Sequence, residues 1–265
     1  MKSGELAMDI WIRAEKAADE GDYNVAIELY REFLERTPDH GEGFAKIAYC
    51  FNELGKTQEA IKAAEKAIEL DPSCVLGHAQ LGWGYKKKET YEEAIHHYER
   101  ALELNPGNDW ILTELSYCWN QDNQFHRGLD YAIQALEVNV DNNFAMGQQL
   151  YALNYLERFS EAIELASDFI GKNPKDEMIW CQKGWAEKKI KNFEAAVASF
   201  RHATELAPND AWNWIQYAEC CNEIGQIAEA EKAAGKALGL DSTSTAAQQE
   251  LRKALSAKEP QQISW

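Results

Sequence analysis

Residues 75–108 read VLGHAQLGWGYKKKETYEEAIHHYERALELNPGN, and this stretch decides the fold. Its second half carries Ala94, Ile95, Tyr98 and Ala101 at spacings of three and four residues, which places apolar side chains on one face of a helix. The proline near its end stops such a helix. We therefore expect two helices in this stretch, joined by a short turn.

The prolines show that this stretch is one copy of a repeat. Val140 and Ser242 stand in the two slots of the series that lack a proline. A fixed period of this size is typical of repeat arrays. Five prolines lie at multiples of 34 residues from one another: Pro38, Pro72, Pro106, Pro174 and Pro208. The seven repeats that this register defines are residues 7–40, 41–74, 75–108, 109–142, 143–176, 177–210 and 211–244.

The third repeat carries a further set of residues in register with the others: Leu81, Gly82, Tyr85, Tyr91, Ala94, Tyr98, Ala101 and Pro106. This pattern resembles the tetratricopeptide repeat (TPR) family, whose 34-residue unit has Leu-Gly, Tyr, Ala, Phe, Ala and Pro at set places. The resemblance covers residues 7–244. It implies an all-α fold, a right-handed α-solenoid of seven helix hairpins in which each hairpin buries its apolar faces against its neighbours.

The ends of the array and its middle differ from this pattern. Residues 245–258 predict a capping helix with an apolar inner stripe, and residues 259–265 predict a flexible tail. No linker interrupts the array, so we expect a single domain over residues 1–265.

Repeats four and five depart most from the pattern, because Val140 replaces proline and Leu150 fills a slot that is small elsewhere. We expect a change of superhelical twist, or a hinge, at that place.

The charge balance narrows the class of partner. The chain has 27 Lys and Arg against 44 Asp and Glu, a formal net charge of −17, whereas nucleic acids and anionic membranes attract clustered Lys and Arg. Neutral and basic partners remain open. No apolar run approaches the roughly 18 residues of a membrane span, and the first residues lack the apolar core of a secretion signal. Six cysteines without metal-binding spacing favour a reduced, cytoplasmic setting.

Catalytic and metal-binding motifs are not found in the sequence, which lacks GxxxxGK[ST], HExxH, GxSxG and CxxC. His96 and His97 lie beside Glu92, Glu93 and Arg100 and predict a solvated helix face, because a metal site needs ligands at i and i+4 on one face. We therefore predict that the protein is not an enzyme, has no catalytic residue, and binds no metal and no cofactor.

The resemblance implies that the first helix of each repeat lines a concave groove. Aromatic side chains, which supply large and rigid contact area, recur at two slots of this helix. The ninth slot holds Tyr49, Trp83, Tyr117, Tyr151 and Trp185, and the second slot holds Trp110, Phe144 and Trp212. These rings could bind a partner, or they could pack on one another and stiffen the array without any ligand.

Carboxamides edge the same groove and can both donate to and accept from a peptide backbone. The sixth slot holds Gln80, Gln148, Gln182 and Gln216, and the twelfth holds Asn52, Asn120, Asn154 and Asn222 together with Lys86 and Lys188. The arrangement is similar to the asparagine ladders of long TPR superhelices that bind extended segments. The Lys, Asn and Arg set with which chaperone-binding members hold a C-terminal carboxylate is absent, because Trp11, Glu15 and Lys46 stand at its places.

A longer period of 102 residues relates repeats three and six. Trp83 and Trp185 match across it, as do the pairs Lys86-Lys87 and Lys188-Lys189. The match indicates either the duplication of a three-repeat block or two similar subsites. The lysines could hold acidic side chains of a ligand, or neutralise neighbouring glutamates.

The sequence therefore favours a cytoplasmic scaffold or adaptor that binds an extended peptide or a helix of a partner protein in the groove. A second hypothesis is a structural subunit that assembles through its ends and convex face, because the first helix exposes Ile10, Trp11 and Ile12 at the uncapped end. A third is the regulatory subunit of a separate enzyme. A monomer is favoured, and the oligomeric state stays open.

Overall fold

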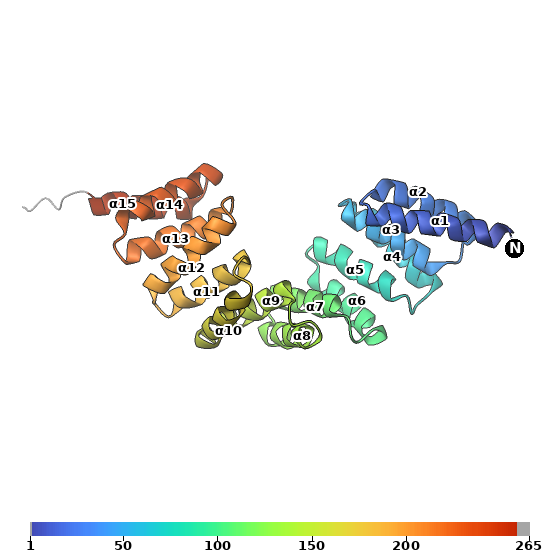
Figure 1. Cartoon of the computed structure of the whole chain (residues 1–265), viewed down its shortest axis with the longest axis horizontal. Coiled ribbons are helices and arrows are strands. Elements are labelled where there is room, and N and C mark those ends of the chain that lie inside the picture. Colours follow the sequence, from blue (N-terminus) through green and yellow to red (C-terminus); the bar gives the residue numbers. More distant parts are fainter. Residues whose placement is uncertain (1, 259–265) are drawn as a thin grey trace, which may run out of the picture. The chain divides into compact units, whose positions relative to one another are not determined.

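The computed structural model describes residues 2–258, with side chains from residue 6 onward. The described residues form fifteen helices in sequence, which pair as seven antiparallel hairpins followed by one last helix (Figure 1). The all-α fold with seven hairpins and a capping helix is thereby confirmed. The predicted tail at residues 259–265 lies outside the described residues.

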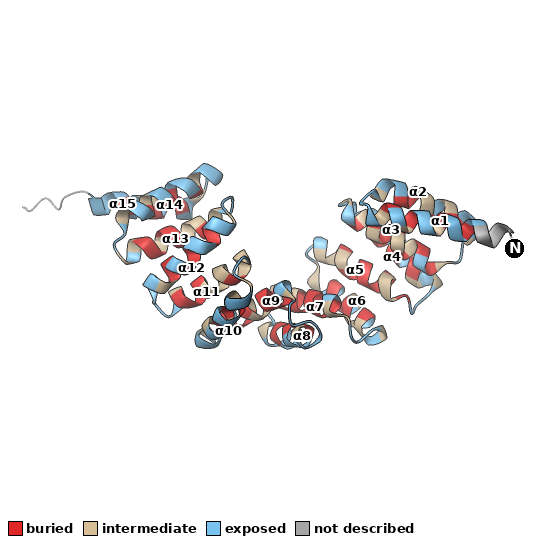
Figure 2. Ribbon diagram, viewed as in Figure 1, coloured by how far each residue is buried: buried red, intermediate tan, exposed pale blue. Residues whose placement is uncertain are grey.

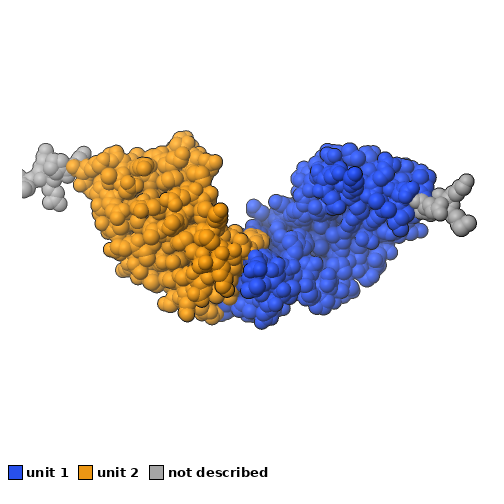
Figure 3. All heavy atoms as spheres, in the orientation of Figure 1, with its two compact units in different colours: residues 1–142 blue, residues 143–265 orange. Residues whose placement is uncertain are grey.

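The helices fall into two compact units, residues 1–142 and residues 143–265 (Figure 3). The boundary lies between repeats four and five, where the sequence predicts a change of twist or a hinge. The N-terminal unit holds α1 (Lys2–Asp19), α2 (Tyr23–Arg36), α3 (Gly41–Glu53), α4 (Thr57–Leu70), α5 (Val75–Lys87), α6 (Tyr91–Leu104), α7 (Asp109–Gln121) and α8 (Phe125–Val138). The C-terminal unit holds α9 (Asn143–Tyr155), α10 (Phe159–Lys172), α11 (Glu177–Lys189), α12 (Phe193–Leu206), α13 (Ala211–Glu223), α14 (Ile227–Leu240) and α15 (Thr245–Lys258).

Each repeat therefore consists of an odd-numbered helix, called the A helix, and the following even-numbered B helix. The turn between them contains a residue with positive φ, such as Gly55 at 70°. Glycine adopts this left-handed conformation without a steric penalty. In four of the seven turns the residue is not glycine: Glu89, Asn123, Glu157 and Lys191 have φ between 58° and 62°.

Burial concentrates where A and B helices face each other (Figure 2). The B-helix rings Tyr30, Tyr98 and Phe200 are fully buried, and the last two each fit against a glycine of their own A helix. A Cβ on Gly82 would lie 2.8 Å from ring carbons of Tyr98, and a Cβ on Gly184 would lie 3.1 Å from those of Phe200. Large and small side chains therefore alternate between the two helices of a hairpin.

We expect Gly82→Ala to destabilise the protein by roughly 1–3 kcal/mol, because the added methyl group overpacks the interface with Tyr98. Gly235→Ala is the matched control, because Gly235 is exposed within α14 and an added Cβ would meet nothing within 4 Å. This change should stabilise the protein by about 0.5–1 kcal/mol. Urea denaturation followed by circular dichroism measures both variants, and a Gly82→Ala variant as stable as wild type would contradict the packing described.

Candidate partner-binding surface

The aromatic residues of the A helices differ in accessibility. Those of the ninth slot, from Tyr49 to Trp185, are all half-buried. The second-slot rings are more accessible, since Trp110 and Phe144 are 38% exposed and Trp212 is 42% exposed. The surface formed by these exposed A-helix side chains is called the A face of each unit.

The 102-residue period corresponds to contacts between rings at the same slots in each unit, although the two tryptophan planes meet at 70° in the N-terminal unit and at 36° in the C-terminal unit. In the N-terminal unit, the centroid of Trp110 lies 6.4 Å from that of Trp83 and 5.9 Å from that of the buried Tyr98. The group formed by these three rings is called the N stack.

The C-terminal unit contains the equivalent group, the C stack. The centroid of Trp212 lies 5.8 Å from that of Trp185 and 6.1 Å from that of Phe200. In both stacks an exposed tryptophan bridges a half-buried tryptophan and a ring in the core, so the core fixes its position.

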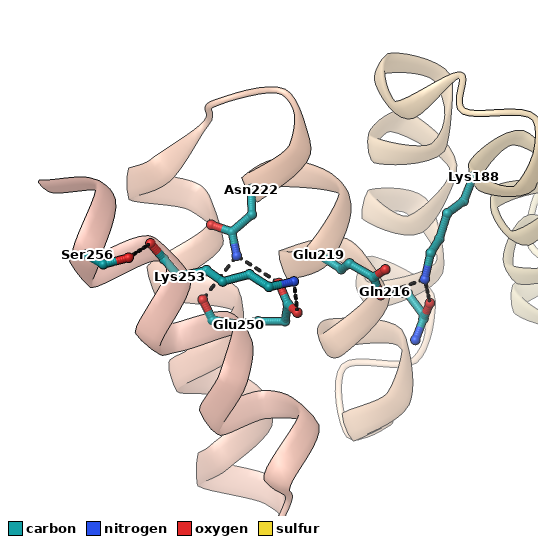
Figure 4. A network of polar contacts seen from close by, with 7 residues as sticks. All are labelled: Lys188, Gln216, Glu219, Asn222, Glu250, Lys253 and Ser256. Carbon is teal, nitrogen blue, oxygen red and sulfur yellow. Dashed lines mark hydrogen bonds and ion pairs between the residues drawn. The ribbon is translucent and has the colours of Figure 1, made fainter.

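The twelfth-slot lysines pair with carboxylates of the next repeat. Lys86 Nζ donates to Glu114 Oε2 at 2.5 Å, and Glu114 is buried. Lys188 Nζ donates to Gln216 Oε1 at 2.7 Å and to Glu219 Oε2 at 2.6 Å (Figure 4). Of the two roles that the sequence leaves open for these lysines, the structure shows the neutralisation of neighbouring glutamates.

The twelfth-slot asparagines bond to the sixth slot of the following repeat. Asn52 Nδ2 donates to the side-chain oxygen of Gln80 at 2.8 Å and also lies 3.2 Å from its backbone oxygen. Asn154 donates to the same two oxygens of Gln182, at 2.9 Å and 3.0 Å. These amide hydrogens tie one A helix to the next.

Asn222 bonds in the same way to the capping helix α15, where Glu250 replaces glutamine (Figure 4). Asn120, Gln148 and Gln216 are buried as well. The predicted contacts of these amides with a ligand backbone therefore compete with contacts between repeats.

We expect Asn154→Ala to destabilise the protein by roughly 1–3 kcal/mol, because Asn154 is only 3% exposed and its loss leaves the amide oxygen of the half-buried Gln182 without this donor. The exposed Gln249 of α15 gives a matched carboxamide control, and Gln249→Ala should change stability by less than about 0.5 kcal/mol. Urea denaturation compares the two. Equal stability of the variants would show that the bonds between repeats contribute little.

The remaining ninth-slot rings contact other tyrosines. Tyr49 packs edge-on against Tyr23 at 6.0 Å, and Tyr117 packs edge-on against Tyr91 at 6.3 Å. Burial raises the pKa of both Tyr49 and Tyr117 to about 12, so these phenols are neutral at physiological pH. Tyr151 lies against Tyr155 with ring centroids 4.6 Å apart. The ninth slot thus contributes both to packing and to surface.

Histidines form a small cluster between α5 and α6. His78 Nε2 lies 3.2 Å from the carbonyl oxygen of Pro72, which only accepts, so this nitrogen carries the proton. His78 Nδ1 is then the acceptor for His97 Nδ1, 3.4 Å away. Tyr85 stacks on His97 with ring planes 4° apart. The expected solvated face is correct for the exposed His96 and wrong for His97, because His97 turns toward α5.

Burial lowers the pKa of His97 to about 4, and the neighbouring His78 and His96 act in the same direction. Burial also lowers the pKa of His78, with Arg100 adding to the effect and Asp71 opposing it. Both imidazoles are therefore neutral in the folded protein and become protonated more readily when it unfolds. Their contribution to stability is complete above the unfolded pKa of about 6.5 and is lost as the pH falls toward 4.

We expect the free energy of unfolding to fall by about 2 kcal/mol through His97 between pH 7 and pH 5. His97→Phe keeps a ring against Tyr85 but does not titrate. Between pH 7 and pH 5, its free energy of unfolding should therefore fall less than that of the wild type. His126→Phe, at an exposed position of α8, is the control. Urea denaturation at the two pH values tests this, and the same pH dependence in all three proteins would refute it.

The other candidate sites of the sequence contribute no reactive group. Within residues 2–258, no group of three or more His, Cys, Asp or Glu side chains is placed to hold a metal ion. All six cysteines are free and five are buried, and burial raises the pKa of Cys50, Cys118 and Cys220 to about 12. These thiols act as packing groups. None of the described helices has the length and apolar character needed to cross a bilayer.

Comparison with protein-family models gives three matches, all described as tetratricopeptide repeat. They cover residues 13–73, 75–108 and 191–255, more than half of the chain. No sequence among curated proteins matches the chain.

Solved structures share the fold at low sequence identity. A tetratricopeptide repeat protein from Parabacteroides merdae has a TM-score of 0.71 and 15% identity, over 96% of this chain and 100% of its own. The APC/C hetero-tetramer Cut9–Hcn1 has a TM-score of 0.74 and 16% identity over 91% of this chain, which spans 48% of the length of that one. PilF from Pseudomonas aeruginosa has a TM-score of 0.68 and 13% identity, with coverages of 83% and 99%.

Proposed function

Because the chain belongs to the tetratricopeptide repeat family, we propose that it is a non-catalytic scaffold that binds a segment of a partner protein on its A face. Proteins of this family generally mediate protein–protein interactions. The observation that carries the proposal is the exposure of Trp110 and Trp212 in two matching ring stacks. The six free cysteines and the net charge of −17 support a protein partner in a reducing compartment, the cytoplasm.

The ring stacks have the properties of binding anchors. Interface hot spots are enriched in tryptophan, and truncating one commonly costs 2 kcal/mol or more of binding energy, roughly thirtyfold in affinity. Trp110 and Trp212 need little ordering on binding, because each is already held by a core ring and a neighbouring indole. Micromolar affinity corresponds to about −8 kcal/mol, so one such anchor would supply roughly a quarter of it.

Assembly through the N-terminal end is the second candidate. Of the three residues that suggest it, Ile10 is buried, and Trp11 packs on Tyr30 and Phe33 of its own hairpin. Ile12 is 57% exposed, and Met8, one helical turn away, is 59% exposed. These two side chains keep an apolar strip at the start of α1.

We expect a Trp110→Ala, Trp212→Ala double variant to lose its partner in affinity capture from a cell extract analysed by mass spectrometry. A Leu206→Ala variant truncates an exposed apolar residue of the B helix α12 and should retain it. Circular dichroism confirms that both variants fold. Retention of all partners by the double variant would end the proposal, and their loss from a Met8→Ser, Ile12→Ser variant instead would favour assembly through the end.

A further inference from the structure

Each ring stack is flanked by an exposed lysine. Lys189 Nζ lies 4.5 Å from the ring centroid of Trp185. Lys87 follows Trp83 by the same four residues, a spacing that puts two side chains on one face of a helix. In the part of the chain that the structure describes, neither Lys87 nor Lys189 is paired with a carboxylate. Both are therefore available to a partner.

The charge at the stacks differs from that of the protein as a whole. The chain carries a net charge of −17, yet lysines gather where α5 and α11 end, at Lys86, Lys87 and Lys88 and at Lys188, Lys189 and Lys191. At physiological ionic strength, charges more than about 8 Å away are largely screened. Lys189, with Nζ 4.5 Å from the ring centroid of Trp185, lies within this range of the C stack.

A basic side chain is disfavoured at the C stack. Cations bind to the face of an indole, but Lys188 and Lys189 already lie 5.3 Å and 4.5 Å from the ring centroid of Trp185. In the N-terminal unit, Lys86 lies 5.4 Å from the ring centroid of Tyr117, which is not part of the N stack. A further cation would be repelled, whereas a carboxylate would be attracted.

We expect the A face to recognise the side chains of a ligand, because the amides that could bond to a ligand backbone already bond to neighbouring repeats. The side-chain amides of Asn52 and Asn154 already donate to the next repeat, and that of Asn222 donates to α15. The exposed groups beside the stacks include the indoles of Trp110 and Trp212 and the ammonium groups of Lys87 and Lys189. Rings bind bulky apolar side chains, and ammonium groups bind carboxylates.

We propose that each stack binds one copy of the same element, a bulky apolar side chain next to an acidic side chain, in an acidic segment of the partner. The apolar side chain packs on Trp110 or Trp212, and the carboxylate pairs with Lys87 or Lys189. This inference rests on the proposed function of the A face. Each stack has an exposed tryptophan between a half-buried tryptophan and a core ring, with an exposed lysine four residues after the half-buried tryptophan, so one chain binds two copies of the element.

Selection from a phage-displayed library of random 12-residue peptides tests the chemistry of the element. The library is selected on the folded full-length chain, and peptides that also bind the Trp110→Ala, Trp212→Ala variant are removed. The remaining peptides should combine Phe, Leu, Ile or Trp with Asp or Glu. A Lys87→Glu, Lys189→Glu variant should bind them at least tenfold more weakly, while Lys62→Glu, Lys236→Glu, at exposed positions of α4 and α14, should bind them as wild type does.

The outcomes separate this inference from the proposed function. Tryptophan-dependent peptides that are basic or uncharged, or that ignore the Lys87→Glu, Lys189→Glu change, would overturn the inference and leave the A face as a binding surface. Recovery of no tryptophan-dependent peptide would overturn both.

Stoichiometry tests the equivalence of the two stacks. The most enriched peptide, synthesised with a fluorescein label, should bind two per chain with similar affinity. Trp110→Ala and Trp212→Ala, each alone, should leave one site. A single site on the wild-type chain would overturn the proposed equivalence.

Discussion

The bond from a twelfth-slot side chain to the residue 28 positions later is the interaction on which the rest of the structure depends. It joins Asn52 to Gln80, Lys86 to Glu114, Asn154 to Gln182 and Lys188 to Gln216. Most of these groups are buried, and a buried polar group without a partner is costly. The bond therefore fixes how successive A helices of one unit align, and with it the direction in which the rings project.

Much of the fold could be predicted from the period of the sequence. A proline ends a helix, and a small residue marks a close contact between helices; both effects follow from the residue type at one position. Pro106 and Gly82 are examples. The left-handed turn at Glu89 could not be predicted, since the hairpin imposes a conformation that glutamate does not favour. The burial of His97 was also missed, because it depends on Tyr85 and His78 across the hairpin.

The candidate surface was predictable as a set of positions but not as a set of contacts. The slots identified which side chains share the A face. They did not show that the amides at Asn154 and Gln182 would bond to each other, or that Trp110 would be more exposed than Trp83. A slot specifies the face of a helix, whereas exposure depends on the neighbouring repeat. The 102-residue match became informative only when the rings at the same slots were in contact in both stacks.

The fit of Tyr98 against Gly82 has a consequence for how such surfaces arise. Removal of one Cβ from an A helix makes room for a ring from the B helix, and that ring in turn supports a tryptophan of the following repeat. Gly82, Tyr98 and Trp110, three positions within two adjacent repeats, thus form one exposed ring group. An array built in this way can therefore gain or lose one ring group through changes in two adjacent repeats, while the hairpins of the other repeats stay as they are.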